Sequence, residues 1–169
     1  VATRYRARIP LRAGSRPRPD RWAVITGPEA HSSIASACDV MDADLIVAAG
    51  DDAGRLTGEA VREALREHGR DGVFAVVGTA GTTNLGIVDD LASTAQACAE
   101  EGLWFHVDGA YGLAGLAAPS VRDRFAGVER ADSFIVDPHK WLFAPFDACA
   151  LVYRDPMTAR AAHTQTAGY

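Results

Sequence analysis

Lysine is almost absent from this chain. Its 169 residues include 17 lysines and arginines together, and Lys140 is the only lysine among them. Every other basic side chain is an arginine, so a single lysine placed after an apolar, strand-like segment is poorly explained as ordinary surface charge. Lys140 is therefore the first candidate for a chemical role.

Cysteine is also scarce, and long apolar runs are missing. The three cysteines are far apart and odd in number, which argues against a disulfide framework and favours reduced thiols in the cytoplasm. We expect them to be small buried residues, with a catalytic cysteine as the alternative. No apolar run approaches the length of a membrane span, about eighteen residues, and no signal peptide is visible.

Positive net charge is missing as well. The formal charge of −5 argues against a nucleic-acid-binding surface, and 48% hydrophobic with 23% charged residues is typical of a soluble globular domain. We therefore expect no nucleic-acid partner, and we expect no membrane partner and no metal ion either. Residues 1–21 differ from the rest: they carry seven arginines, three prolines and one acid, Asp20. They are interpreted as a poorly ordered basic stub, with an anion-binding arm as the alternative.

The remainder, residues 22–169, alternates short apolar runs with amphipathic stretches. Helices are predicted over 31–41, 57–69 and 88–102, with a short helical region before Arg130. Strands are predicted over 22–27, 44–49, 72–80, 103–110, 133–137 and 148–154. Apolar strands separated by helices indicate an α/β fold with a largely parallel sheet covered on both faces. In such sheets ligands bind beyond the carboxyl ends of the strands, which selects residues 28–33, 79–84, 108–111 and 137–140.

Lys140 and Asp108 carry the chemistry at those strand ends. Pro138 ends the strand that precedes Lys140, and a lysine at such a rim can form an imine with a carbonyl, as in pyridoxal phosphate (PLP) enzymes. A surface lysine is the simpler alternative. Asp108 closes the segment "WFHVD", where a carboxylate needs a cation or several hydrogen bonds, and a protonated pyridine nitrogen is such a cation. Capping a helix or binding Mg²⁺ are the alternatives.

Two further residues fit the same ligand. Ala110 is small enough to lie against a ring, and His31 in "PEAHSS" could stack on the opposite face. A histidine that makes a helix-start hydrogen bond is the other interpretation of His31. The loop "GTAGTTN" (78–84) offers hydroxyl groups, although Gly/Thr turns are common.

Four ordered segments resemble one enzyme family. The residues that match its lysine-site signature are Ser133, Phe134, Lys140, Trp141, Leu142, Phe146, Ala148, Leu151 and Arg154. This pattern looks like that of the group II PLP-dependent amino-acid decarboxylases, which include aromatic-amino-acid, histidine, glutamate and sulfinoalanine decarboxylases. The segments "AHSSI" (30–34), "GTAGTTNLG" (78–86) and "HVDGAYG" (106–112) resemble the same family in the same order, so the resemblance covers about residues 22–169.

The resemblance implies a role for each candidate. Lys140 would form the internal aldimine with PLP, and Asp108 would pair with the pyridine nitrogen. Ala110 and His31 would sandwich the ring, and His31 would help to orient the substrate. The remaining candidates would contact the phosphate, the aldimine or the ring substituents: His139, Thr82 and Thr83.

One position departs from the pattern. Some relatives have asparagine before the proline, whereas this chain has Asp137, so a contribution to phosphate binding is in doubt there. The resemblance also places the main phosphate-binding serines upstream and a mobile loop with a catalytic tyrosine downstream of this segment. We therefore expect the chain to be the middle of a larger domain.

The resemblance implies fold type I, a homodimer, and α-decarboxylation of an L-amino acid to an amine and CO₂. Two alternatives stay open: another fold-type I PLP enzyme, such as a desulfurase or aminotransferase, and an inactive truncated copy. Aromatic substrates are weakly favoured, because no arginine lies in a segment expected to face the substrate.

Overall fold

The computed structural model describes residues 19–164. The predicted basic stub therefore lies almost wholly outside the described residues; of its last three positions, Pro19 is buried and Arg21 pairs with Asp44 at 2.9 Å. None of the helices in the described part of the chain is long and apolar enough to cross a membrane.

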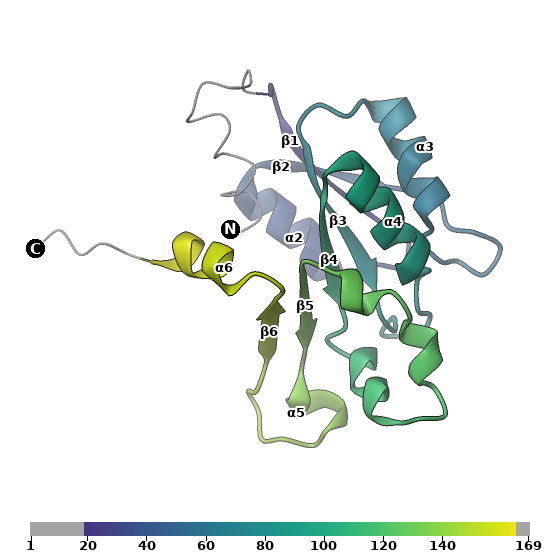
Figure 1. The fold of residues 1–169 in the computed structure, drawn as a ribbon, viewed down its shortest axis with the longest axis vertical. Helices are drawn as coiled ribbons and strands as arrows, with labels where there is room; N and C mark the ends of the chain where they lie inside the picture. Colours follow the sequence, from purple (N-terminus) through teal and green to yellow (C-terminus); the bar gives the residue numbers. More distant parts are fainter. Residues whose placement is uncertain (1–18, 165–169) are drawn as a thin grey trace, which may run out of the picture.

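The sheet has six strands in the order β2-β1-β3-β4-β5-β6 (Figure 1). Strands β1 to β5 are parallel, and β6 runs antiparallel to β5. Their bounds are β1 Trp22–Thr26, β2 Ala43–Val47, β3 Val73–Thr79, β4 Trp104–Asp108, β5 Ser133–Val136 and β6 Ala150–Tyr153. The largely parallel α/β sheet that the sequence predicts is confirmed.

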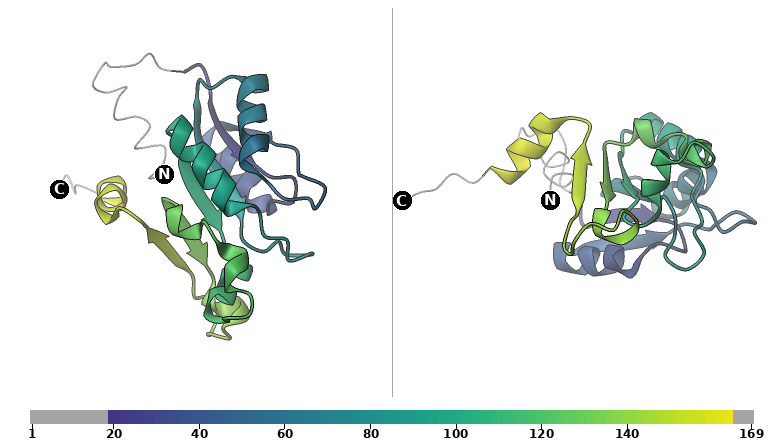
Figure 2. Two further views of the ribbon diagram at one scale, coloured as in Figure 1. Left: turned by 45° about the vertical axis from the view of Figure 1, so that its right-hand side comes forward. Right: turned by 90° about the horizontal axis from the view of Figure 1, so that it is seen from below.

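Helices cover both faces of this sheet (Figure 2). Helices α3 (Gly58–His68) and α4 (Leu91–Glu101) lie side by side on one face, and α2 (Ser32–Met41) lies on the other. The chain also forms short helices and 3-10 turns at η1 Gly112–Ala117, η2 Arg122–Phe125, η3 Val128–Arg130, α5 Pro138–Trp141 and α6 Pro156–His163.

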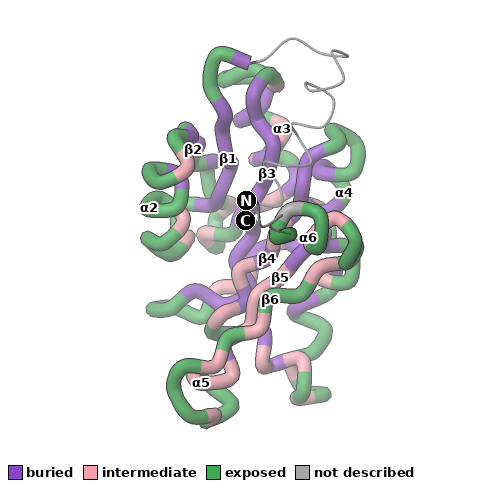
Figure 3. The backbone as a smooth tube through the Cα atoms, turned by 90° about the vertical axis from the view of Figure 1, so that its left-hand side faces the viewer, coloured by how far each residue is buried: buried purple, intermediate pink, exposed green. Residues whose placement is uncertain are grey.

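The core forms where alternate strand residues meet these helices. Every residue of β1 and β3 is buried, which is why both strands are apolar almost throughout rather than alternating (Figure 3). Ile25, Val76 and Phe105 pack under α3 and α4, whereas Trp22 and Trp104 belong to a second cluster on the face of α2. The central strands are thus fixed from both sides, and their carboxyl ends share one edge.

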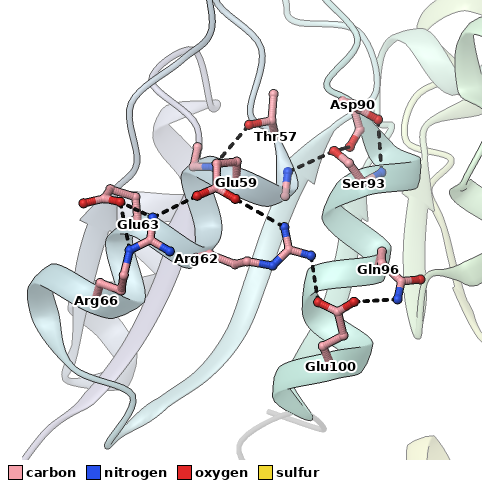
Figure 4. Close-up of polar contacts among 11 residues, drawn as sticks. Thr57, Glu59, Arg62, Glu63, Arg66, Asp90, Ser93, Gln96 and Glu100 are labelled. Carbon is pink, nitrogen blue, oxygen red and sulfur yellow. Dashed lines mark hydrogen bonds and ion pairs between the residues drawn. The ribbon is translucent and has the colours of Figure 1, made fainter.

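Helices α3 and α4 are joined by hydrogen bonds and by close backbone contact (Figure 4). The Gly58 N–H donates to Ser93 Oγ at 2.9 Å, and a Cβ on Gly58 would lie 2.2 Å from the Ser93 carbonyl oxygen. Arg62 pairs with Glu100 at 2.7 Å on the solvent side. Exposed pairs of this kind stabilise a protein only weakly, so the close approach at Gly58 is the feature that requires its residue type.

The predicted helix 88–102 begins later than expected. Val88 forms an isolated bridge with Ala80, and Asp90 is the N-cap of α4, its side chain accepting from Ser93 N at 3.1 Å. Between them, Asp89 is buried and accepts two backbone hydrogen bonds, from Leu56 N at 2.8 Å and Thr79 N at 2.6 Å. Asp89 therefore ties the start of α4 to the carboxyl end of β3.

The buried carboxyl of Asp89 predicts a pH-dependent contribution to stability. Burial raises its pKa from 3.8 to about 6, although both backbone hydrogen bonds oppose the shift. The folded state therefore holds this proton more tightly than the unfolded state does. The resulting contribution to the free energy of unfolding is complete below the pKa of the unfolded state and is lost as the pH rises through about 6.

We compare the free energy of unfolding of the wild type minus that of Asp89→Asn. This difference is expected to fall by about 3 kcal/mol between acidic and neutral pH, because only the wild type loses the contribution of the protonated carboxyl group. Urea unfolding of both proteins at several pH values measures it, and the difference cancels the titration of other carboxylates. Parallel stability profiles would contradict this role for Asp89.

The cysteines only partly follow expectation. Cys38 and Cys98 are buried, and burial raises the pKa of Cys98 to about 12. Cys149 is exposed, so the prediction of burial is wrong for this residue. It lies in the segment between α5 and β6, outside the sheet and the helices that cover it.

Candidate active site

A cavity of about 320 Å³ opens at the carboxyl edge of the parallel strands. Its walls include residues from all four segments that follow β1, β3, β4 and β5. Six of the seven predicted site residues line it: His31, Thr82, Thr83, Asp108, Ala110 and Lys140. The register explains this convergence, because Thr79 pairs with Asp108 and Asp108 with Ile135, so the three strands end level.

Two glycines bring the loops after β3 and β4 together. Gly81 has φ of +101°, and a Cβ there would lie 2.7 Å from Gly112 Cα. A Cβ on Gly112 would lie 2.4 Å from the Ala80 carbonyl oxygen. No larger residue fits at either position without moving the backbone, so the wall that carries Thr82 and Ala110 depends on both glycines.

Asp108 has one oxygen engaged in the protein and one that is not. Its Oδ1 accepts a hydrogen bond from Ala110 N at 3.1 Å, which fixes the turn that follows β4. Within residues 19–164, no donor is found for Oδ2. The side chain is partly buried and lines the cavity, so a cationic ligand group there would satisfy it.

His31 is both a helix cap and a cavity residue. It is the N-cap of α2, and its Nδ1 accepts from Ser33 N at 3.2 Å and lies 2.9 Å from Ser33 Oγ. A ring nitrogen that accepts a backbone N–H carries no proton, so the proton of the neutral ring is on Nε2. The helix-start interpretation and the cavity interpretation of His31 thus hold together, while ring stacking stays a prediction.

Lys140 is held at the cavity wall by the segment that follows β5. Asp137 N donates to Ala110 O at 3.1 Å, which joins this segment to the loop after β4, and Lys140 N donates to Asp137 O at 2.9 Å. Pro138 occupies the first turn of α5, where its missing N–H is not needed. The Lys140 ammonium forms an ion pair with Asp137, at 2.8 Å from Nζ to Oδ2.

His139 does not line the cavity. Its Nδ1 lies 2.6 Å from the Ala148 carbonyl oxygen and 3.1 Å from Ala148 N, and its ring packs edge-on against Phe146. It therefore holds the chain that returns toward β6. Thr82 lines the cavity, but its Oγ1 accepts from Ile87 N at 3.1 Å, whereas Thr83 is exposed. The roles of these three residues in binding a cofactor stay predictions.

The structure adds residues that sequence reasoning did not select. Tyr111 lines the cavity, and its ring stacks on Trp141 with centroids 5.4 Å apart. His106 also lines it; burial lowers the pKa of this histidine, and its Nδ1 lies 2.8 Å from Ser133 Oγ. The alternation of β4 could have indicated His106, because residues two apart on a strand share a face and Asp108 is two positions on.

The residues present fit a pyridine aldehyde. The cavity places a primary amine, a carboxylate with a free oxygen, a histidine and a small alanine on one set of walls. An amine suits an aldehyde, and a carboxylate suits a protonated ring nitrogen. Lys140, Asp108, His31 and Ala110 are the residues that would hold such a group.

Solved structures share this fold, and one of them was determined with PLP. The crystal structure of mouse CSAD matches with a TM-score of 0.88 and 30% identity, covering 98% of this chain and 36% of that chain. The crystal structure of Oryza sativa TDC with PLP and tryptamine matches with a TM-score of 0.88 and 29% identity, covering 99% of this chain and 36% of that chain. The sheet and its site thus define the class: fold-type I PLP-dependent enzymes.

The family follows from the sequence. The family model described as the pyridoxal-dependent decarboxylase conserved domain matches residues 1–169, and the chain belongs to this family. Aromatic-L-amino-acid decarboxylase of Bacillus atrophaeus is 40% identical over 101 residues, covering 58% of this chain and 21% of the relative. Histidine decarboxylase of Mus musculus is 35% identical over 137 residues, covering 80% and 21%. The chain thus spans about a fifth of the length of these curated relatives.

Proposed function

We propose that this chain is the cofactor-binding segment of a PLP-dependent decarboxylase that converts an L-amino acid into the corresponding amine and CO₂. The observation that carries the proposal is the placement of Lys140 and Asp108 on the walls of one cavity. Membership of the pyridoxal-dependent decarboxylase family supports the reaction class, and the resemblance around Lys140 supports the cofactor.

Each residue then has a defined task. Lys140 attaches the cofactor covalently through its amine, and the carboxylate of Asp108 keeps a proton on the pyridine nitrogen. Bound pyridoxal phosphate supplies an electron sink for the electron pair of the bond to the leaving carboxylate. His31, with its proton on Nε2, presents a donor at the cavity wall, and Ala110 leaves room for a flat ring.

The substrate, the assembly and the location belong to the same proposal. Aromatic amino acids are the favoured substrates, in line with the names of several relatives. A homodimer is supported by four large apolar side chains that are exposed beside the site, at 48% for Trp141, 54% for Leu142, 89% for Phe143 and 85% for Phe146. A cytoplasmic location is supported by free thiols at all three cysteines.

A substrate panel tests the reaction. The protein, loaded with pyridoxal phosphate, is incubated with aromatic, acidic and imidazole-bearing L-amino acids, and amine and CO₂ are measured together. Release of the two products in equal amounts is the expected result, with the highest rate for an aromatic substrate. Formation of a keto acid without CO₂ would indicate an aminotransferase instead of a decarboxylase, and formation of sulfide without CO₂ would indicate a desulfurase. A loaded protein that forms no product from any substrate would contradict the proposal.

A further inference from the structure

The amine assigned to the cofactor is already paired with an acid of the same chain. Lys140 Nζ lies 2.8 Å from Asp137 Oδ2, and the side chains are 38% and 11% exposed. Among the described residues, Asp137 is the only acid within ion-pair distance of this ammonium. The pair lies on the cavity wall, so it occupies the place where an aldehyde would have to approach.

Among the described residues, the Asp137 side chain is contacted by the Lys140 ammonium and by the Cys149 thiol. It is the N-cap of α5, yet its side chain makes no cap hydrogen bond. Its Oδ1 is buried and has no N–H or O–H partner among the described residues. Positions three apart on a helix turn share a face, so the spacing of Asp137 and Lys140 directs both side chains to the same side.

The electrostatics of Asp137 agree with this pairing. Burial alone would raise its pKa, but hydrogen bonds from Lys140 and from the Cys149 thiol, together with the positive charge of Lys140, lower the pKa below its usual value. Asp137 is therefore an anion at neutral pH. The negative charge of Asp137 would repel the negative charge of a phosphate group, so this carboxylate does not favour phosphate binding.

We propose that Asp137 is a positioning residue: its ion pair with Lys140 holds the amine at the cavity wall and must break before the amine can capture an aldehyde, so Asp137 limits the rate of capture rather than binding the cofactor's phosphate. The inference rests on the proposed function, in which Lys140 is the amine that attaches the cofactor. It also accounts for the departure at position 137, because asparagine carries no charge and would leave the ammonium unpaired.

The capture step shows where the proton must go. The ammonium of Lys140 first gives one proton to water, the neutral nitrogen attacks the aldehyde carbon, and the carbonyl oxygen leaves as water. Borohydride then adds hydride to the C=N bond and makes the link permanent. The other titratable groups that line the cavity with this amine are Glu29, His31, His106, Asp108 and Tyr111, and the Cys149 thiol lies beside Asp137.

Because Lys140 is the only lysine, no other ε-amine of the chain can react with an added aldehyde. Wild type, Asp137→Asn and Asp147→Asn are mixed with pyridoxal or with pyridoxal phosphate at neutral pH, quenched with borohydride at intervals, and mapped by peptide mass spectrometry. Asp147 is an exposed acid of the same segment that lies outside the cavity walls, so its variant is a control with the same change in net charge. Mapping separates Lys140 from the α-amino group.

We expect Asp137→Asn to attach both aldehydes about three- to tenfold faster than the wild type, and Asp147→Asn to match the wild type. Acceleration with pyridoxal phosphate alone would mean that Asp137 repels the phosphate, and it would overturn the inference. Equal rates in all three proteins would overturn the inference and leave the proposed function standing. No attachment to Lys140 in any protein would overturn both.

A second measurement covers the case in which Asp137→Asn fails to fold. Salt weakens an ion pair whose lysine is partly exposed, so the wild type should capture pyridoxal faster as the ionic strength rises. A rate that is independent of salt would overturn the inference without any variant.

Discussion

Lys140→Ala is expected to abolish the attachment of pyridoxal phosphate that borohydride makes permanent, and to lower decarboxylation by about a thousandfold or more. The reason is that the chain has no other ε-amine. A free amine from solution cannot replace one that is fixed on the cavity wall, because the fixed amine is already placed for attack. Stoichiometric attachment is measured by mass spectrometry, and turnover by CO₂ release.

The alanine variant also removes the cation from Asp137, so a matched variant is needed. Lys140→Arg keeps a positive charge that can pair with Asp137 but cannot form an imine at neutral pH. We expect Lys140→Arg to be as inactive as Lys140→Ala while unfolding at nearly the temperature of the wild type. If Lys140→Arg retained turnover, Lys140 would not be required for the reaction.

The strands and the layers could be predicted from the sequence because a strand that is buried on both faces is a continuous run of apolar residues. The segments that became β1 and β3 are apolar almost throughout, and the helix between 57 and 69 has its apolar residues on one face. The rule that ligands bind beyond the carboxyl ends of parallel strands then selected four segments, and residues from all four line the cavity.

The parts that could not be predicted depend on local geometry. Helix α5 has four residues, which is too short for any periodic pattern. Within such a turn, residues three apart point the same way, whereas Lys140 and its neighbour His139 point in different directions. Sequence reasoning placed both near the cofactor, but the structure directs only Lys140 into the cavity. The antiparallel direction of β6 likewise follows from the segment between α5 and β6, whose sequence carries no clear signal of it.

Asp108 is predicted from its place at the end of a strand, and the hydrogen bond that it accepts can be separated by experiment from the charge pairing that we propose for it. Its Oδ1 accepts a hydrogen bond from Ala110 N, which any side chain with a carbonyl oxygen at this position could do. Its negative charge is what the pyridine nitrogen would require. One substitution distinguishes these functions, because asparagine keeps the oxygen and loses the charge.

Asp108→Asn is expected to lower decarboxylation by about a hundred- to a thousandfold while Lys140 still attaches the cofactor. Without the carboxylate the pyridine nitrogen loses its proton more easily, and each pKa unit lost there costs about 1.4 kcal/mol of the charge stabilisation that the carboxylate provides. The measurement is the ratio of turnover to covalently bound cofactor, so a variant that merely binds less cofactor is recognised. Asp108→Glu restores the charge at a displaced position and should recover part of the rate. If Asp108→Asn turns over as fast as the wild type, Asp108 acts only through the turn that it forms with Ala110.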